Sequence, residues 1–391
     1  MKPPFSRAEY RRRVDNTRRH MREAGVDVLM VSDPANMNYL TGYDGWSFFV
    51  HQMVALGLED DEPIWFGRPM DANGARVTTF LKDESIFEYP DHYVQSDRFH
   101  PMEVLAEIAK EKGWARARIG VEKEAYYFTV RAMEVLERHL PKATFQDATG
   151  LVNWVRLVKS KNEIAYMTQA ARIAEKVMRT GINAVKPGVR QCDAAAEIWR
   201  AMVKGTPQFG GDYPGLPPVL PSGGAIAAPH LTWSDETFKK GEGTVLELAG
   251  VRFHYHCPIT RTVFLGPLPK KVTETAAVVL EGMQAAFDAM RPGVTGHDVE
   301  AAWRSVVSRH GITKESRIGY STGLGYPPDW GEHTVSLRPN DRSVLRENAT
   351  LHVIPAVTVD DWAVDISECV RVTKRGAVPF CDFPRKLFVK R

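Results

Sequence analysis

The sequence predicts a protein of two domains, an α/β domain followed by an α+β domain built on an antiparallel sheet. A chain of 391 residues is too long for one ordinary hydrophobic core. In its first part, short apolar runs such as VDVLMV alternate with segments of helical periodicity. Further along, the pattern changes to long amphipathic helices separated by pairs of strands. We therefore place the first domain at residues 1–155 and the second at residues 156–391.

The elements of the first domain follow from its apolar runs and their spacing. A helix is predicted over residues 6–25, where Gly25 ends it, and a buried strand over 26–31. The segment SDPANMNYLTGY is rich in turn-forming residues, so we expect it to turn the chain. SFFVHQMVALGL and EPIWFG are typical of consecutive strands. The remaining expected elements are helices over 101–113 and 127–139 and strands near 118–121 and 144–147.

The second domain begins with a capping box. Ser160 is followed three residues later by Glu163, a spacing that predicts the start of a long amphipathic helix. The rest of the domain alternates between helices and pairs of strands, which indicates an antiparallel sheet. The expected helices are 161–184, 191–203, 271–290 and 296–309, and the expected strands are 243–253, 257–265, 349–358 and 363–373.

Composition and charge argue against several classes of protein. The formal net charge of +3 is too small for a nucleic-acid binder that works by bulk charge. No apolar run approaches the ~20 residues that span a membrane, and the N-terminus lacks the apolar core of a signal peptide. The four cysteines have no CxxC spacing, which is typical of reduced thiols in a cytoplasmic protein. We therefore expect a cytoplasmic globular protein that binds neither membranes nor nucleic acid.

Four segments of the second half carry a resemblance to a known family. In chain order they are VRLVKSKNEIAYMTQAARIAEKVM, PHLTWSDETFKKGEGTVLELAG, ITRTVFLG and ISECVRVTKRG. Together they resemble the pita-bread fold shared by creatinase, proline-specific aminopeptidases and methionine aminopeptidases. The first half is similar to the creatinase-type N-terminal domain, so the resemblance covers nearly the whole chain. It implies a creatinase-type α/β domain at 1–155 and a pita-bread α+β domain with an antiparallel sheet at 156–391.

Metal-dependent members of that superfamily hold two metal ions with two Asp, one His and two Glu. The matching positions here are, in order, Glu247, Pro258, Leu324, Ile354 and Ser367, or Glu368 for the last if the register slips by one. Proline, leucine and isoleucine offer no side-chain donor, whereas a dinuclear site needs several oxygen and nitrogen donors. The resemblance therefore implies that the dinuclear site is absent and that no metal cofactor is bound.

Creatinase is the precedent for hydrolysis on this fold without a metal. Within that branch, NYLTGYDGWSFFVHQ and GYPPDWGEH resemble the ectoine hydrolases, which open the cyclic amidine ring of ectoine to N-acetyl-diaminobutyrate. The resemblance implies a hydrolase acting on the C–N bonds of a cyclic amidine, ectoine or its hydroxylated form. The carbon between the two nitrogens is already electrophilic, so a metal is dispensable. The reaction needs a nucleophile or water activator, a proton donor and a pocket for a charged ring.

Two residues are expected to carry out the chemistry. His230, in AAPHLTW, resembles a histidine retained by metal-dependent and metal-free members alike, and imidazole titrates near neutral pH, so we assign it proton transfer. Glu247, in VLELAG, is expected to face the same cavity and to pair with the amidinium. It can activate water or attack the amidinium carbon directly. The structural alternatives are a hydrogen-bonded core histidine and a salt bridge from Glu247 to Arg261.

Seven residues are expected to bind the substrate. They are Tyr326, Asp329, Trp330 and Glu332 in GYPPDWGEH, Tyr43 and Trp46 in the first domain, and Glu368 in ISECV. For Asp329, Trp330 and Glu332 the reason is that an acid beside an aromatic ring suits a cationic ring, and Tyr326 can donate a hydrogen bond. For Tyr43 and Trp46 the resemblance to creatinase-like dimers implies that this region reaches the partner's active site. Phe48 and His51 follow in the same first-domain segment, and His352 is a further candidate, although packing explains each of them equally well. His254 and His256 alternate on the hairpin beside a single acid, which is a weak pattern for a metal site.

Three alternative functions remain open for the same sequence. A creatinase-like C–N hydrolase of a small amidino or guanidino acid needs a similar pocket. A metal-dependent Xaa-Pro dipeptidase needs the ligands that are missing here. An inactive binding protein on this fold has no use for His230 together with Glu247. The family resemblance also implies a homodimer, and the ring-opened product implies a deacetylase as a metabolic partner.

Overall fold

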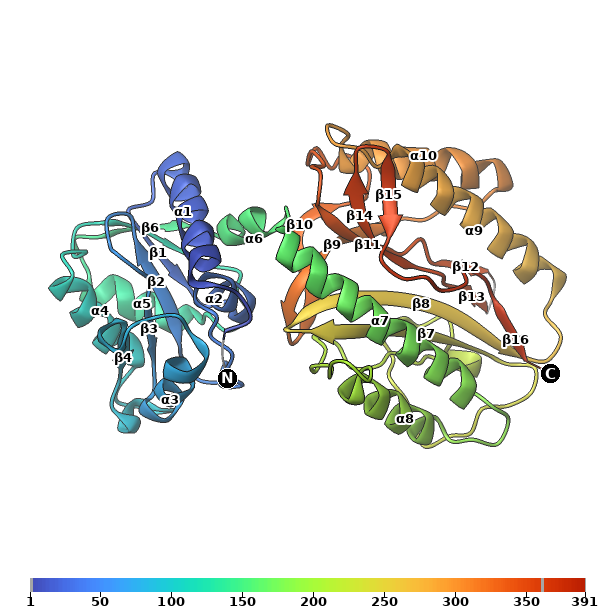
Figure 1. Ribbon diagram of the computed structural model, residues 1–391, viewed down its shortest axis with the longest axis horizontal. Helices are drawn as coiled ribbons and strands as arrows, with labels where there is room; N and C mark the ends of the chain where they lie inside the picture. Colours follow the sequence, from blue (N-terminus) through green and yellow to red (C-terminus); the bar gives the residue numbers. More distant parts are fainter. Residues whose placement is uncertain (1–2, 360–361, 391) are drawn as a thin grey trace. The chain divides into compact units, whose positions relative to one another are not determined.

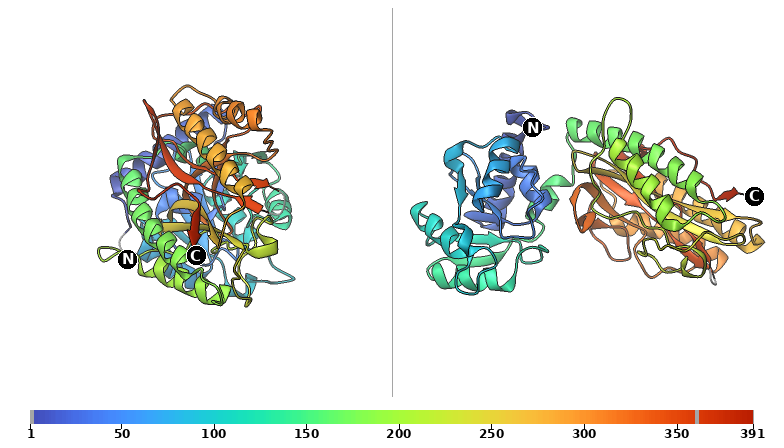
Figure 2. Two further views of the ribbon diagram at one scale, coloured as in Figure 1. Left: turned by 90° about the vertical axis from the view of Figure 1, so that its right-hand side faces the viewer. Right: turned by 90° about the horizontal axis from the view of Figure 1, so that it is seen from below.

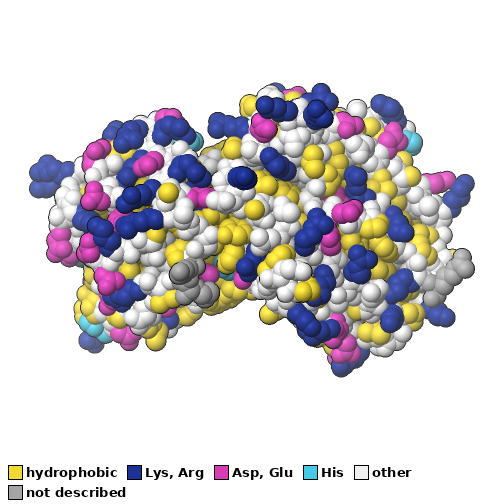
Figure 3. Space-filling view, viewed as in Figure 1, with side chains coloured by type: hydrophobic (Ala, Val, Ile, Leu, Met, Phe, Trp, Pro, Cys, Tyr) yellow, Lys and Arg dark blue, Asp and Glu magenta, His cyan; other side chains and the backbone are white. Residues whose placement is uncertain are grey.

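The computed structural model describes residues 3–359 and 362–390, and the chain divides into two compact units, Met1–Arg156 and Leu157–Arg391 (Figure 1). The boundary expected between residues 155 and 156 lies beside this division. Each unit has its own sheet and its own core. Within the described ranges, no helix is both long and apolar enough to cross a membrane. Basic and acidic side chains are interspersed over the face drawn in Figure 3, in keeping with the small net charge.

Unit 1 is an α/β fold around a six-stranded sheet of order β4-β3-β2-β1-β5-β6. Strand β2 runs antiparallel to both of its neighbours, and the other pairs are parallel. The strands are β1 Val28–Val31, β2 Met53–Gly57, β3 Ile64–Gly67, β4 Ile86–Glu88, β5 Arg118–Val121 and β6 Thr144–Asp147. The helices are α1 Arg7–Ala24, α2 Pro34–Thr41, α3 Pro69–Thr78, α4 Pro101–Glu111, α5 Val130–His139 and α6 Leu151–Arg156.

Helix α3 and strand β4 of unit 1 were not expected from the sequence, and two further segments differ from their expected form. Pro34–Thr41, expected as a turn, forms helix α2 because the Asp33 side chain accepts a hydrogen bond from the Asn36 N–H at 3.0 Å. A proline also suits the first turn of a helix, where its missing N–H costs nothing. The strand expected over SFFVHQMVALGL shortens to β2, since residues 47–52 form a loop closed by side-chain hydrogen bonds.

Unit 2 is an α+β fold around an eight-stranded sheet of order β15-β14-β11-β9-β8-β16, with β7 paired to β8 and β10 to β9. The pairs are antiparallel except β16 with β8, which confirms the predicted class. Helices α7 Lys161–Ala184 and α8 Gln191–Lys204 lie side by side along the sheet (Figure 2). Helices α9 Lys270–Ala289 and α10 Gly296–Val307 form a second pair. The strands are β7 Gly243–Arg252, β8 Tyr255–Leu265, β9 Gly319–Tyr326, β10 Asp329–Ser336, β11 Thr350–Val353, β14 Glu368–Thr373, β15 Gly376–Pro379 and β16 Phe388–Lys390, with β12 Val357–Val359 and β13 Trp362–Val364 pairing separately.

Gly250 shows which face of the sheet helix α7 covers. An added Cβ at this position would lie 2.1 Å from a backbone carbonyl oxygen of α7. Side chains alternate along a strand, so Leu246 and Leu248 share this covered face, where both approach Gly181 of α7. Glu247 therefore points to the opposite face of the sheet.

One hairpin of unit 2 was not expected from the sequence. Residues 319–336 form β9 and β10 on either side of the cis peptide bond Pro327-Pro328. The glycines and prolines of this stretch are typical of loops, and they hide the strand pattern. The capping box of Ser160 and Glu163, in contrast, is present as predicted and starts α7.

Candidate active site

Five polar residues from separate strands share the face of the unit 2 sheet that α7 leaves uncovered. Glu247 on β7 is the register partner of Thr260 on β8, and Tyr320 on β9 is the register partner of His352 on β11. Ser367, just before β14, donates its backbone N–H to the Thr260 carbonyl at 3.1 Å. We call Glu247, Thr260, Tyr320, His352 and Ser367 the inner-face cluster.

Glu247 is a buried carboxyl group without a cation. The residue is 8% exposed, and among the described residues its side chain makes no hydrogen bond or ion pair. Burial, with the neighbouring Asp365 and Asp329 carboxyls adding to it, raises the pKa of Glu247 to about 8. An ionised carboxylate is costly in such a place unless a cation approaches it. The sheet therefore presents a group that gains most from a positively charged ligand.

A run of hydrogen bonds crosses the cluster from Trp330 to Thr260. The Trp330 indole N–H donates to the Tyr320 hydroxyl at 2.8 Å, and this hydroxyl lies 3.0 Å from Nδ1 of His352. Nε2 of His352 lies 2.6 Å from Ser367 Oγ, which donates to Thr260 Oγ1 at 2.9 Å. Burial lowers the pKa of His352 to about 3, so the ring is neutral and has one N–H. The Ser367 hydroxyl donates its proton to Thr260, so it can only accept a hydrogen bond from His352. His352 therefore donates from Nε2 and accepts from the Tyr320 hydroxyl at Nδ1.

A second buried acid, Asp365, was not singled out from the sequence. It is 8% exposed, and its Oδ1 is buried with no hydrogen-bond partner in residues 3–359 and 362–390. Burial raises the pKa of Asp365 to about 7, against the opposing charges of Lys314 and Arg261. The Thr262 hydroxyl holds its backbone, accepting the N–H at 2.9 Å and donating to the carbonyl at 3.0 Å. Asp365 and Glu247 thus form a pair of carboxyl groups that both titrate near neutral pH.

Tyr326 and Asp329 lie at the tip of the β9–β10 hairpin. Tyr326 is largely buried, and its ring stacks on His254 with the centroids 4.2 Å apart. Asp329 accepts two backbone N–H groups of its own turn and faces Nε2 of His333 at 2.9 Å. Burial opposes ionisation, but these hydrogen bonds lower the pKa of Asp329. Asp329 is therefore ionised at neutral pH, and it acts on Glu247 through its charge.

Three residues that were expected to bind substrate lie inside the fold instead. Trp330 is fully buried and is held through its indole N–H. Glu332 forms an ion pair with Lys159 at 2.5 Å, and both side chains are fully buried. Glu368 forms one with Arg261, also at 2.5 Å and also buried. A buried charge that the protein itself pairs has no need of a charged ligand, which favours a structural role for these side chains. Substrate binding by them stays a prediction.

His230 lies apart from the inner-face cluster. It is exposed, its φ is 70°, and in the described part of the chain no hydrogen bond, ion pair or ring contact involves its side chain. The titratable groups that act on Glu247 are Asp365 and Asp329. Proton transfer by His230 therefore stays a prediction, and the buried acids Glu247 and Asp365 are further candidates for proton transfer.

Tyr43 and Trp46 have different surroundings in unit 1. Tyr43 is buried, its hydroxyl lies 2.8 Å from Ser47 Oγ, and its ring lies 5.1 Å from that of Trp65. Tyr43 is thus a core residue of unit 1, and substrate binding by it stays a prediction. Trp46 is 56% exposed and packs against Phe48 with the ring centroids 4.9 Å apart.

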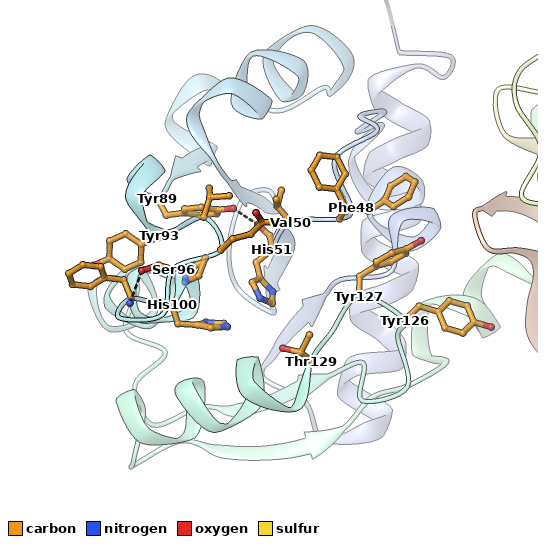
Figure 4. Close-up of a pocket in the computed structure, with 15 residues that line it drawn as sticks. Phe48, Val50, His51, Tyr89, Tyr93, Ser96, His100, Tyr126, Tyr127 and Thr129 are labelled. Carbon is orange, nitrogen blue, oxygen red and sulfur yellow. Dashed lines mark hydrogen bonds between the residues drawn. The ribbon is translucent and has the colours of Figure 1, made fainter.

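A cavity of about 260 Å³ in unit 1 is lined mainly by aromatic rings (Figure 4). It includes Phe48 and His51 of the segment quoted above, together with Tyr89, His100 and Tyr127. The rings of His51 and His100 lie 4.6 Å apart, and burial lowers the pKa of both, to about 4 for His100. None of the described residues that line it is an aspartate, glutamate, lysine or arginine. This cavity therefore suits an uncharged or aromatic group.

The residues at the metal-ligand positions do not fit a dinuclear metal centre. Pro258, Leu324 and Ile354 have no side-chain donor, and Leu324 is packed in the interior. The Ser367 hydroxyl is already engaged within the inner-face cluster. Glu247 keeps a carboxyl group, and Glu368, the alternative for the last position, is already paired with Arg261. In the ranges that the structure describes, no group of three or more His, Cys, Asp or Glu side chains could hold a metal ion.

Comparisons with known proteins cover both units. The Creatinase/Prolidase N-terminal domain matches residues 13–158, and Metallopeptidase family M24 matches residues 165–374. The ectoine hydrolase of Halomonas elongata is 45% identical over 394 residues, covering 99% of this chain and 98% of its own. The Xaa-Pro dipeptidase of Pyrococcus furiosus is 23% identical, covering 96% of this chain and 99% of its own. The solved prolidase from Thermococcus sibiricus superposes with a TM-score of 0.85 at 20% identity over 97% of this chain and 99% of its own, which confirms the predicted fold.

Sequence reasoning missed Asp365 and the roles of Tyr320 and Ser367. Asp365 precedes the ligand-equivalent position Ser367 by two residues, and residues two apart on an extended chain share a face. That spacing was the signal that could have found it. Tyr320 carried no such signal, because its strand was not recognised as a strand.

Proposed function

Because this chain belongs to Metallopeptidase family M24 and is a hydrolase acting on C–N bonds, we propose that it opens the cyclic amidine ring of ectoine, or of hydroxylated ectoine, to N-acetyl-diaminobutyrate. The ectoine hydrolase of Halomonas elongata, 45% identical over nearly the whole of both chains, supports this choice of substrate. We also propose that the reaction needs no metal, since the ligand-equivalent positions offer too few donors.

The observation that carries the proposal is the environment of Glu247. A carboxyl group with a pKa of about 8 and no cation among the described residues is suited to a substrate that brings its own positive charge. An amidinium supplies that charge at the carbon that must react. Peptide substrates of the dipeptidase relatives would present a neutral amide there, and a neutral amide would leave the carboxylate unpaired.

The same residue can move the proton that the reaction requires. When the amidinium binds, its charge lowers the pKa of Glu247, which releases its proton to the solvent as the carboxylate forms. The carboxylate takes a proton from a water molecule, whose oxygen bonds to the carbon between the two nitrogens. The bond from this carbon to one nitrogen then breaks, and Glu247 returns the proton to that nitrogen. The proton of the new hydroxyl passes to the released amine as the carbonyl forms, so the products are an amide and an ammonium group. Direct attack by the carboxylate on the same carbon, followed by hydrolysis, gives the same products.

The proposal is tested by incubating chelator-treated protein of measured metal content with ectoine and following the ring signals by NMR. We expect ring opening to an N-acetylated diamino acid, and no gain in rate on adding zinc or manganese. Activity that appears only with added metal would overturn the metal independence. Turnover of creatine instead of ectoine would overturn the substrate and favour the creatinase-like alternative.

Two partner proposals accompany this function. The product is an N-acetylated amine, so a deacetylase is the class of enzyme that would consume it. A homodimer is proposed from the family resemblance alone, and light scattering of the purified chain measures it directly. A monomeric mass for an active enzyme would contradict the dimer without touching the reaction.

A further inference from the structure

Arg317 lies next to the inner-face cluster with its guanidinium available. It stands just before β9, and its Cζ lies 4.3 Å from the centroid of the Tyr320 ring. The side chain is exposed, and in the described ranges it makes no hydrogen bond and no ion pair. Stacking on a tyrosine ring fixes the plane of the guanidinium while leaving its N–H donors to other groups.

Tyr320 connects Arg317 to Glu247. The Tyr320 hydroxyl begins the hydrogen-bonded run that passes through His352 and Ser367 to Thr260, the register partner of Glu247. Two electrostatic effects agree with this proximity. After burial, the Glu247 charge is the next cause that raises the pKa of Tyr320, and the Arg317 charge is the next cause that lowers the pKa of His352. The cluster thus lies near both the Glu247 carboxyl group and the Arg317 guanidinium, which makes no ion pair in the described ranges.

Ectoine carries two opposite charges, an amidinium and a carboxylate, on one small ring. Resting on the function proposed above, we propose that Arg317 binds the substrate carboxylate while Glu247 binds the amidinium, so that the site selects cyclic amidines that bear a carboxylate. The guanidinium offers a planar, two-pronged set of donors that matches a carboxylate.

Lys314 is the competing cation near this face, and its surroundings are less suitable. Its ammonium donates to the Ala356 carbonyl at 2.8 Å and is partly buried. Burial lowers the pKa of Lys314, and Asp365 is the acid that opposes this shift. Lys314 is therefore already engaged by the protein, whereas Arg317 keeps its donors for a ligand.

The test compares two substrates on matched variants. The substrates are ectoine and the same cyclic amidine without its carboxylate. The variants are Arg317→Ala, Arg317→Lys and, as a control, Arg309→Ala, which removes another exposed arginine of unit 2. For Arg317→Ala we expect KM for ectoine to rise roughly 10- to 100-fold with little change in kcat, as for the loss of a charge-assisted hydrogen-bonded pair. KM for the analogue should stay unchanged, Arg317→Lys should give an intermediate KM, and Arg309→Ala should match the wild type.

The possible results distinguish the assignment of Arg317 to the substrate carboxylate from the proposed ring-opening function. If the wild type opens ectoine and Arg317→Ala keeps the wild-type KM, the carboxylate assignment is wrong and the ring-opening function stands. If KM for Arg317→Ala rises equally for both substrates, the carboxylate assignment is also wrong, because the substitution would then disturb the structure of the site and not a contact with the carboxylate. If the wild type neither binds nor opens either amidine, the proposed function fails and this inference fails with it.

Discussion

Three buried glutamates of unit 2, Glu332, Glu368 and Glu247, differ in whether a cation pairs with the side chain. Glu332 meets Lys159 and Glu368 meets Arg261, each at 2.5 Å. Glu247 has no such partner in the described part of the chain. A buried charge is tolerated when it is paired and is costly when it is not. The two paired acids are therefore compensated inside the protein, whereas Glu247, with no cation in the described ranges, is the acid that we propose pairs with a cationic ligand.

The largest expected effect comes from Glu247→Gln. Turnover should fall by roughly 10³-fold or more, because the variant can neither take up nor return a proton. The fold should persist, since an amide avoids the cost of an unpaired buried carboxylate. Initial rates and circular dichroism measure both effects. The matched control is Glu281→Gln, on an exposed position of α9. If Glu247→Gln turns over substrate at a rate close to that of this control, Glu247 does not transfer the proton.

Glu332→Gln should show the opposite pattern. Removing one partner of a buried pair leaves Lys159 uncompensated, and the free energy of unfolding should fall by about 3–5 kcal/mol. The rate per folded molecule should stay near the wild-type value. Denaturant unfolding gives the first quantity and active-site titration the second. A double variant, Lys159→Met with Glu332→Leu, should recover most of the stability; a large loss of rate in folded Glu332→Gln would instead return this residue to the active site.

The dependence of stability on pH should reveal the contribution of Glu247. Folding raises the pKa of Glu247 from 4.5 to about 8, so between these values the folded state holds a proton that the unfolded chain has lost. Stability due to this group therefore falls as pH rises through that window, by about 1.4 kcal/mol per pH unit, and is constant outside it. The difference in unfolding free energy between the wild type and Glu247→Gln, measured from pH 4 to 9, isolates this effect. A difference that is flat across the window would mean that Glu247 is ionised in the folded protein.

The smallest expected effect comes from Ser367→Ala. The substitution leaves the His352 Nε2–H without its acceptor, which should cost about 1–2 kcal/mol of stability. It also removes the donor to Thr260, so we expect a moderate fall in kcat with little change in KM. Ser367→Thr, which keeps the hydroxyl, should restore most of both. A loss as large as that of Glu247→Gln would show that the inner-face cluster works as one catalytic unit.

The sequence predicted most of the fold because its signals are local. The capping box before α7 and the strand pair that became β7 and β8 depend on residues a few positions apart. The hairpin of β9 and β10 was missed because glycine and proline dominate its pattern. The same limit applies to the site. Alternation along a strand predicts that Glu247 faces away from its strand neighbours, and the structure confirms that it lies on the face opposite to α7.

The partners of the other acids could not be predicted in this way. Lys159 and Glu332 are 173 positions apart in the chain, and Arg261 and Glu368 are 107 apart. The sequence analysis offered Arg261 as a partner for Glu247, but the two residues lie on opposite faces of their hairpin, because Arg261 is the register partner of Leu246. Only the assembled sheet decides which acid receives a cation and which is left for a ligand.

The hydrogen-bonded run across the inner face has a direction, and this limits what it can do. Every donor in it points from Trp330 toward Thr260, and an indole N–H cannot accept a hydrogen bond. A hydrogen-bonded path that carries protons must be able to reverse the direction of each hydrogen bond. The Trp330 indole can only donate, so this run cannot reverse. The aligned hydrogen bonds therefore form a fixed dipole whose positive end is at Thr260, the register partner of Glu247. The run cannot carry a proton from the site into the protein. In the proposed reaction, the proton that Glu247 takes from water is therefore returned to the product.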